Sequence, residues 1–313
     1  MRMKDVTAGM MAMMSLGASD VRRFVRNARN PAYWRKLNPQ LSISGKPDLE
    51  KIQAKAISAA AKRTALEKLD SDGYFQIDPV YPGRLLNALR EGIENLARAN
   101  WPAPFIYVYD EPWAMKRIPS FIDLIDAILG PSHRELQNVW AHFLRPVPGA
   151  HGWQPHMDGP TLGGRVSAWF PVTDATLENG CIYIVPQNRI PDSLTENFAR
   201  RATFRQPELQ LLMHAARALP VKAGSILGWN FKVLHWGSVA GQTRQPRISL
   251  ATEFVAADAP NVDLDNAPLD AHTSIPEFDV RLELIGRAIV AFPTFEPMML
   301  RYRAVAQHLW HSR

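Results

Sequence analysis

The chain has 313 residues, of which 46% are hydrophobic and 21% are charged, and this composition excludes an intrinsically disordered or low-complexity protein. Its single cysteine, Cys181, excludes an internal disulfide framework and a zinc site made of several cysteines. With no credible export signal and no stretch near the ~20 apolar residues of a membrane span, the sequence predicts a cytoplasmic protein.

The net charge of +6 is concentrated near the N-terminus. Residues 1–50 hold nine basic and four acidic side chains, a balance of +5, so residues 51–313 are nearly neutral. A basic helical N-terminal segment (1–50) is therefore predicted to precede one further domain (51–313). The segment could dock an anionic partner or a carrier protein, but a solvated helix face is the simpler interpretation.

Residues 1–135 are predicted to be mainly helical, because apolar residues recur there at helical spacing. A short strand, GYFQID, is predicted at 73–78. The predicted helices span 19–37 (broken at Pro31), 54–70, 82–100 and 118–129.

From residue 137 the pattern changes to short runs rich in β-branched and aromatic residues. These runs span 139–145, 165–172, 181–185, 225–229 and 248–255. Turn residues separate them, as in an antiparallel sandwich or barrel. A helical, arginine-containing insertion at 190–220 interrupts this core of 137–256, and helical patterning returns at 274–313.

Two short elements suggest metal chemistry. His156 and Asp158 are separated by one residue, so in an extended backbone both side chains point to one face and can bind one ion. His235 lies at the end of an apolar strand. Two histidines and one carboxylate form the facial triad of non-haem iron(II) oxygenases. Downstream, Arg247 and Ser249 suit the distal carboxylate of a small diacid, because arginine binds carboxylates bidentately.

These features occur in an order that resembles the phytanoyl-CoA dioxygenase family of iron(II)- and 2-oxoglutarate-dependent oxygenases, over residues 137–256. The resemblance is carried by Pro148-Gly149 after the first core strand, the H-x-D motif, WFPVTDATLENGCIYIVPQNR, AGSILGWNFKVLHWGS and the R-x-S motif. Two departures concern the region that usually sets specificity: Pro155 where the family often has Trp, and PQNR at 186–189 where it often has P-G-S-H. No substrate is therefore transferred from the family, coenzyme A thioesters included.

The resemblance implies a double-stranded β-helix (jelly-roll, cupin-like) core with helical N-terminal, inserted and C-terminal segments. It implies that His156, Asp158 and His235 bind Fe(II), and that Arg247, helped by Ser249, holds the cosubstrate 2-oxoglutarate. The implied reaction consumes O2, releases succinate and CO2, and oxidises an unactivated C–H bond of a small molecule, a chemistry found in secondary metabolism. Hydroxylation is the default outcome, and desaturation and ring closure stay open. Related halogenases lack the carboxylate of Asp158, so halogenation is disfavoured.

Other residues near the motifs have both a functional and a structural interpretation. The candidates for contact with substrate are His151, Trp153, Arg165 and Trp169. Loop packing, a core position or a solvated rim charge is the favoured interpretation of each, and Lys232 is also interpreted as a rim charge. Cys181 is predicted to be a small buried hydrophobe. The remaining histidines have no partner at ligand spacing and are predicted to be structural or surface residues: His133, His142, His214, His272, His308 and His311.

Several alternatives remain open at this stage. The insertion at 190–220 could close over the iron as a lid, or it could serve for packing or for a dimer contact. A cupin-like metal-binding protein without oxygenase activity could share the two-histidine, one-carboxylate site. An anion- or nucleic-acid-binding module rests on the basic charge alone and is disfavoured. The expected partner is a small molecule, anionic or carrier-linked, and the protein is expected to be a monomer or homodimer with no membrane partner.

Overall fold

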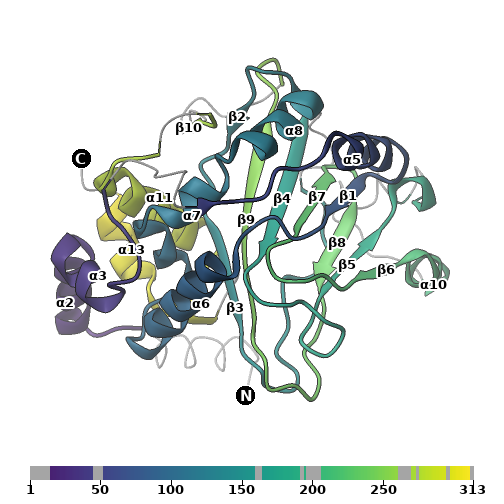
Figure 1. Cartoon of the computed structure of the whole chain (residues 1–313). Coiled ribbons are helices and arrows are strands. Elements are labelled where there is room, and N and C mark those ends of the chain that lie inside the picture. Colours follow the sequence, from purple (N-terminus) through teal and green to yellow (C-terminus); the bar gives the residue numbers. More distant parts are fainter. Residues whose placement is uncertain are drawn as a thin grey trace.

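Two antiparallel sheets face each other in the computed structural model, which describes residues 15–44, 52–158, 164–190, 194, 206–259, 269–272, 275–293 and 297–310 (Figure 1). The larger sheet has the order β1-β7-β4-β9-β2-β10, with β3 also paired to β9, and the smaller one has the order β6-β5-β8. The strands of the larger sheet are β1 (Tyr74–Ile77), β2 (Arg134–Glu135), β3 (Trp140–Leu144), β4 (Arg165–Pro171), β7 (Ile226–Asn230), β9 (Arg247–Val255) and β10 (Leu269–Asp270). Those of the smaller sheet are β5 (Ile182–Val185), β6 (Arg217–Leu219) and β8 (Leu234–Gly237). The predicted jelly-roll core with flanking helices is confirmed.

Helices pack on the side of the larger sheet that faces away from the smaller one (Figure 1). They are α2 (Ala18–Ala28), α3 (Pro31–Leu37), α5 (Ala59–Asp72), α6 (Gly83–Arg98), α7 (Glu111–Met115), α8 (Pro119–Leu129), α11 (Phe278–Ala291), α12 (Pro297–Arg301) and α13 (Arg303–Trp310), with the 3-10 helix η1 (Ala103–Val108). The predicted break at Pro31 is the start of α3, where Asn30 caps the helix and proline needs no amide hydrogen. None of the described helices combines the length and hydropathy needed to cross a membrane.

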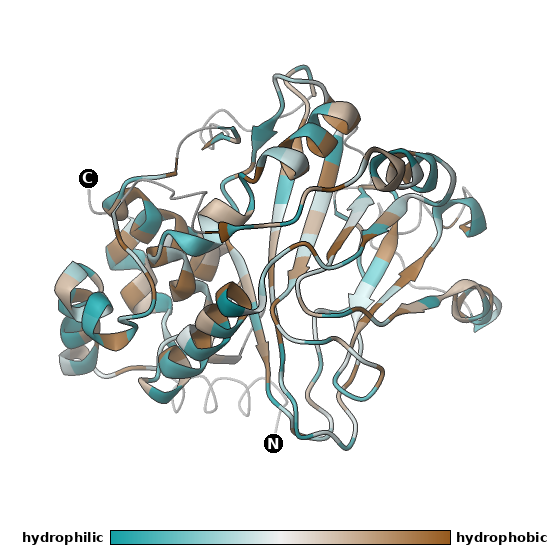
Figure 2. Ribbon diagram, in the orientation of Figure 1, coloured by the Kyte–Doolittle hydropathy of each residue, from teal (hydrophilic) through white to brown (hydrophobic). Residues whose placement is uncertain are grey.

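The side chains of strand β9 point alternately into two different environments. Ile248, Leu250 and Phe254 belong to the core beneath the helices. The alternate residues, from Arg247 to Glu253, therefore point to the other side, toward the smaller sheet. Figure 2 shows this alternation as bands of brown and paler colour along β4 and β9. The site is built on this inner face.

The prediction for the second half of the chain needs two corrections. The insertion was predicted to be helical over 190–220, but residues 217–219 form β6, which pairs with β5, and the helix α10 covers Gln206–Ala215. Residues 191–193 and 195–205 of the insertion lie outside the described part, and its role as a lid, a packing element or a dimer contact stays a prediction. His235 does not end the strand that begins near Ser225. The chain turns after Asn230, whose side-chain oxygen accepts the amide hydrogen of Lys232, and His235 lies on β8 of the smaller sheet.

The N-terminal helix α2 presents its basic residues to solvent, as the simpler interpretation of the charge expects. Arg22, Arg23 and Arg26 are exposed, whereas Phe24 is buried against Trp101 and contacts Tyr302. The predicted boundary at residue 50 lies in 45–51, outside the described residues, so the domain division stays a prediction.

Candidate active site

The predicted ligands His156, Asp158 and His235, called the triad below, converge from the segment before β4 and from β8. The backbones of His156 and His235 exchange two hydrogen bonds of 3.0 Å each. His156 Nε2 lies 3.4 Å from Asp158 Oδ1, and His235 Nε2 lies 3.7 Å from Asp158 Oδ2. One ligand atom from each residue lies within 4.8 Å of the other two. The geometry suits a single ion, and the ligand role remains a prediction.

Backbone carbonyls orient both imidazoles. His156 Nδ1 lies 2.7 Å from the carbonyl oxygen of Gln154, and His235 Nδ1 lies 3.3 Å from that of Val233. A carbonyl accepts a hydrogen bond and cannot donate one, so Nδ1 carries the proton in the neutral ring. The Nε2 lone pair of each ring is then directed toward Asp158, which is the tautomer that a metal ligand requires.

The carboxylate of Asp158 is fixed by two donors from the larger sheet. Ser167 on β4 and Trp229 on β7 donate hydrogen bonds of 2.7 and 2.8 Å to its Oδ2 atom. Burial would raise the pKa of Asp158, but the charges of His235 and His156 and the hydrogen bonds from His156 and Ser167 outweigh it, and the pKa is held well below its usual range. Asp158 is therefore ionised. Ser167 and Trp229 were not predicted from the sequence, although the alternation along β4 places Ser167 on the inner face with Arg165.

The pKa values of the two imidazoles are shifted in opposite directions. Burial lowers the pKa of His235 to about 4, with the charge of Asp158 opposing it. Burial also acts to lower the pKa of His156, but the hydrogen bond and charge of Asp158 outweigh it and the net shift is upward. At neutral pH the imidazole of His235 is therefore neutral, and a cation bound at the triad would compete with a proton on His156.

Arg247 and Ser249 are buried polar groups without matching partners. Their exposed fractions are 1% and 0%, and Arg247 Nε and Nη1 and Ser249 Oγ have no hydrogen-bond partner among the described residues. Burial lowers the pKa of Arg247 to about 10, so it remains charged at neutral pH. A buried cation without an anion is costly. This end of the inner face is therefore suited to an anionic ligand.

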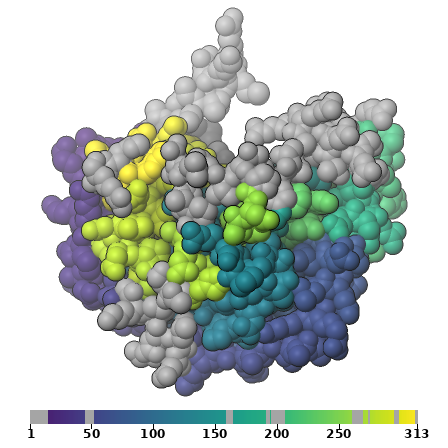
Figure 3. Space-filling view, turned by 90° about the horizontal axis from the view of Figure 1, so that it is seen from above, coloured from purple at the N-terminus to yellow at the C-terminus, as the bar shows by residue number. Residues whose placement is uncertain are grey.

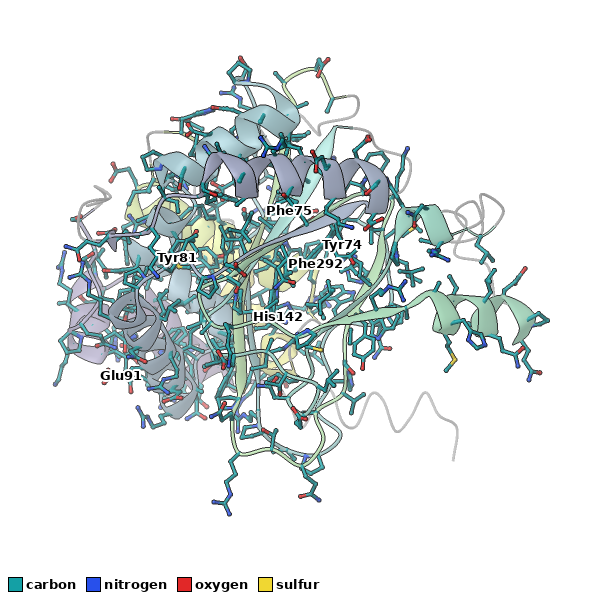
Figure 4. The ribbon with its side chains drawn as sticks, turned by 45° about the vertical axis from the view of Figure 1, so that its right-hand side comes forward. Tyr74, Phe75, Tyr81, Glu91, His142 and Phe292 are labelled. Atoms are coloured by element: carbon teal, nitrogen blue, oxygen red, sulfur yellow. The ribbon has the colours of Figure 1, made fainter. Side chains whose placement is uncertain are left out.

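Two glycines make room for the Arg247 guanidinium. A Cβ atom on Gly237 would lie 2.8 Å from the Cα atom of Gly152, and a Cβ on Gly152 would lie 2.9 Å from Arg247 Nη2. Any side chain at either position would fill the space beside the guanidinium. His142 of β3, the register partner of Ser249, also lies here (Figure 4). Burial lowers the pKa of His142 well below its usual range, and our sequence analysis assigned it no site role.

The other residues predicted to contact substrate differ in burial and in their distance from the triad and Arg247. Trp153 packs against His156 with ring centroids 5.6 Å apart, and Trp169 is buried with its ring 5.9 Å from the guanidinium carbon of Arg247. His151 is exposed, as is Lys232. Arg165 is half-buried on β4. None of these placements tests a contact with substrate, so that role stays a prediction for all four candidates.

Glu253 is the acidic residue of the inner face that our sequence analysis missed. It pairs in register with Ser167, and Asn138 Nδ2 donates a 2.6 Å hydrogen bond to its carboxylate. Desolvation and the charge of Asp158 raise the pKa of Glu253 to about 7. The two-residue period that links Arg247 and Ser249 would have reached Glu253 if it had been extended along the strand.

A comparison with family models identifies the domain. Residues 108–249 match the model of the phytanoyl-CoA dioxygenase (PhyH) family. None of the curated proteins compared with the sequence matches it. The family resemblance predicted from the motifs is confirmed.

Solved structures with the same fold are similar over most of the chain. One is the non-haem α-ketoglutarate-dependent epimerase SnoN from nogalamycin biosynthesis, with 18% identity, a TM-score of 0.52, and coverage of 70% of this chain and 94% of SnoN. Another is the nickel complex of the non-haem monooxygenase ThoJ, with 15% identity, a TM-score of 0.52, and coverage of 74% and 98%. The fold and the family model define an enzyme of the iron- and 2-oxoglutarate-dependent oxygenase superfamily. Within that superfamily, residues 108–249 are similar to the phytanoyl-CoA dioxygenase family.

Proposed function

We propose that the protein is an Fe(II)- and 2-oxoglutarate-dependent dioxygenase that hydroxylates an unactivated C–H bond of a small molecule. The observation that carries this proposal is the buried pair Arg247 and Ser249, whose Nε, Nη1 and Oγ atoms have no hydrogen-bond partner among the described residues. This pair lies on the same inner face as the triad, whose nitrogen and oxygen atoms could bind a metal ion. A metal-binding cupin without oxygenase activity has no need of such a pair.

The residues present fit both groups. His156 Nε2, His235 Nε2 and an oxygen of Asp158 would hold the iron, and Arg247 with Ser249 would bind the distal carboxylate of 2-oxoglutarate. When bound with dioxygen, iron and 2-oxoglutarate supply oxidising power, with release of succinate and CO2. A complex of SnoN with Fe3+ and alpha ketoglutarate, 17% identical with a TM-score of 0.51 and coverage of 70% of this chain and 97% of SnoN, supports the choice of these groups.

The contribution of this chain is orientation and charge. Ser167 and Trp229 hold Asp158 in one rotamer, so its carboxylate needs no reorganisation to bind a cation. The carbonyls of Gln154 and Val233 hold the two imidazoles in the required tautomer. Arg247 is desolvated in advance, so its attraction for a carboxylate is stronger than in water.

An anaerobic titration tests the proposal. Protein with Fe(II) and 2-oxoglutarate should develop a visible metal-to-ligand charge-transfer band, because a chelated keto acid is required for it. His156→Ala should lose the band, whereas His214→Ala, a matched change of an exposed histidine on α10, should keep it. The absence of a band in the wild-type protein at saturating concentrations would refute the proposal.

The reaction outcome needs a second experiment. Small molecules, including amino acids, acyl conjugates and natural-product scaffolds, are screened for stimulation of succinate release. With labelled dioxygen, hydroxylation puts the label into the product. A stimulating substrate that yields an unlabelled, desaturated or cyclised product would keep the enzyme class and overturn the hydroxylase assignment.

A further inference from the structure

A second group of two histidines and one aspartate lies away from the triad. Asp126 is on α8, His133 lies between α8 and β2, and His272 follows β10, the last strand of the larger sheet. We call these three residues the edge cluster. One ligand atom from each lies within 4.8 Å of the other two, as in the triad. Figure 3 shows this side of the molecule, where teal atoms of the α8 region meet yellow-green atoms nearer the C-terminus.

Two distances within the edge cluster are close to those between neighbouring ligands of a bound zinc ion. Asp126 Oδ1 lies 3.0 Å from His133 Nδ1 and 3.2 Å from His272 Nε2. Zinc holds nitrogen and oxygen ligands at about 2.0–2.2 Å in a tetrahedron, which sets neighbouring ligands about 3.3 Å apart. Two imidazole nitrogens and one carboxylate oxygen would leave a fourth position for water.

The surroundings of His272 favour a cation. Its Nε2 atom faces Asp126, and its Nδ1 atom lies 3.5 Å from Asp270 Oδ1. A neutral imidazole has one N–H, so one nitrogen must meet a carboxylate without a proton between them. A metal ion at Nε2 removes this conflict, because Nδ1–H then faces Asp270. Carboxylate–histidine–zinc arrangements of this kind are common in zinc proteins.

His133 supplies a buried, preoriented nitrogen. Its side chain is 0% exposed, and within the described residues its Nε2 atom has no hydrogen-bond partner, so its polar contacts are made by Nδ1, which lies 3.0 Å from Asp126 Oδ1 and 3.2 Å from the carbonyl oxygen of Gly130. A bound ion would take the place of the proton that Nδ1 shares with these oxygens, and the ring proton would then lie on Nε2. Burial lowers the pKa of His133, which keeps the ring neutral and able to bind a metal. Its ring packs on Phe254, which lies on the helix-covered side of β9, whereas the triad lies on the inner side.

We propose that the edge cluster is a structural zinc site that ties α8 to the segment after β10. The ladder between β10 and β2 has two residue pairs, Leu269 with Glu135 and Asp270 with Arg134. An ion bound by Asp126, His133 and His272 would connect α8, the segment before β2 and the segment after β10 at this edge of the sheet. The site is independent of the catalytic proposal, since it uses none of the residues of the triad.

Zinc binding to the tag-free, full-length protein tests this site with the metal alone as the probe. The protein is first stripped of metal with a chelator, the chelator is removed, and zinc is added back. Bound zinc is then counted by elemental analysis, and its affinity is measured by competition with a metal indicator. The background is His156→Ala, in which the triad is disabled. This variant should retain about one zinc ion, and adding His272→Ala or Asp126→Asn should weaken that binding at least about tenfold.

The variants also separate metal loss from misfolding. Circular dichroism and thermal unfolding in chelator should be alike for His156→Ala with and without His272→Ala, because His272 is partly exposed. Zinc should raise the unfolding temperature of the first protein and not of the second. If His156→Ala binds no zinc, or if its zinc binding survives both edge-cluster substitutions, the proposal is overturned. Either result leaves the iron proposal intact, because that proposal is tested by the absorption band.

Discussion

The triad and the edge cluster contain the same side chains, yet they differ in what surrounds them. In the triad, Asp158 places one oxygen near each imidazole, and Ser167 and Trp229 bind its Oδ2 atom. In the edge cluster, a single oxygen of Asp126 lies between both imidazoles, and no such donor to Asp126 is found among the described residues. The triad is thus held in place by its neighbours, whereas the edge cluster is held by its own members.

A second difference concerns charge. The inner face that carries the triad also carries Arg247, a buried cation without a partner anion among the described residues. Near the edge cluster, His272 lies between two carboxylates. The first arrangement is suited to an anionic cosubstrate beside a metal, and the second is suited to a cation alone. The set of candidate ligands is therefore the same, and the neighbouring charges distinguish the proposed catalytic site from the proposed structural one.

The largest expected effect comes from Arg247→Met, which removes the cation and keeps an unbranched side chain. We expect 2-oxoglutarate to bind about 100-fold more weakly, because loss of one partner of a buried, hydrogen-bonded charge pair costs about 2–5 kcal/mol of binding free energy. Iron binding should change little. Anaerobic titrations of the iron-loaded protein, followed by the visible band, measure the first quantity, and metal competition measures the second.

The same substitution should stabilise the ligand-free protein. A buried, unpaired charge destabilises the fold, so replacement by an apolar side chain of similar length should raise the free energy of unfolding, measured with urea. Equal losses of iron and 2-oxoglutarate binding would contradict the role of Arg247. Zinc binding at the edge cluster serves as the internal control and should be unchanged.

A smaller effect is expected from Trp229→Phe, which deletes one donor to Asp158 and keeps most of the ring. Partners that orient a metal ligand typically contribute 10–100-fold to metal affinity, so we expect a loss of about tenfold for a metal at the triad. Zinc competition in the His272→Ala background reports this site alone. A change confined to thermal stability, with unaltered affinity, would mean that the indole serves packing only.

Much of the fold and the triad could be predicted because the sequence signals are local. An H-x-D pair on extended backbone brings two ligands to one face without knowledge of the remaining chain. The R-x-S motif follows from the same period, and so do the strands of the core. The family order then supplied the connection between His156 and His235, which are far apart in sequence.

The rest depends on contacts between distant segments. The edge cluster joins residues from α8, the approach to β2 and the segment after β10, and neither His133 nor His272 has a ligand at motif spacing. Trp229 reaches Asp158 only because β7 pairs with β4. The strand β6 follows from pairing with β5, which overrides the helical pattern of its own residues.

The last prediction is electrostatic and concerns Glu253→Gln. The folded-state pKa of Glu253 is about 7, above the ordinary value of 4.5. The folded protein therefore keeps a proton that the unfolded chain has already lost, and the free energy of unfolding falls as the pH rises from about 4.5 to about 7. Glutamine carries no such proton. Relative to wild type, the variant should gain about 1–3 kcal/mol between pH 5 and pH 8, measured by urea unfolding of the metal-free protein.

This pH dependence also tests whether the triad and the edge cluster act separately. A divalent cation at the triad offsets the charge of Asp158, one of the two causes of the raised pKa of Glu253, so zinc should shrink the difference between wild type and Glu253→Gln. The shrinkage should disappear in His156→Ala and persist in His272→Ala, because the edge cluster lies on the other side of β9. Parallel pH profiles for wild type and variant would show that Glu253 is ionised throughout, and would remove the electrostatic link between this carboxylate and the metal.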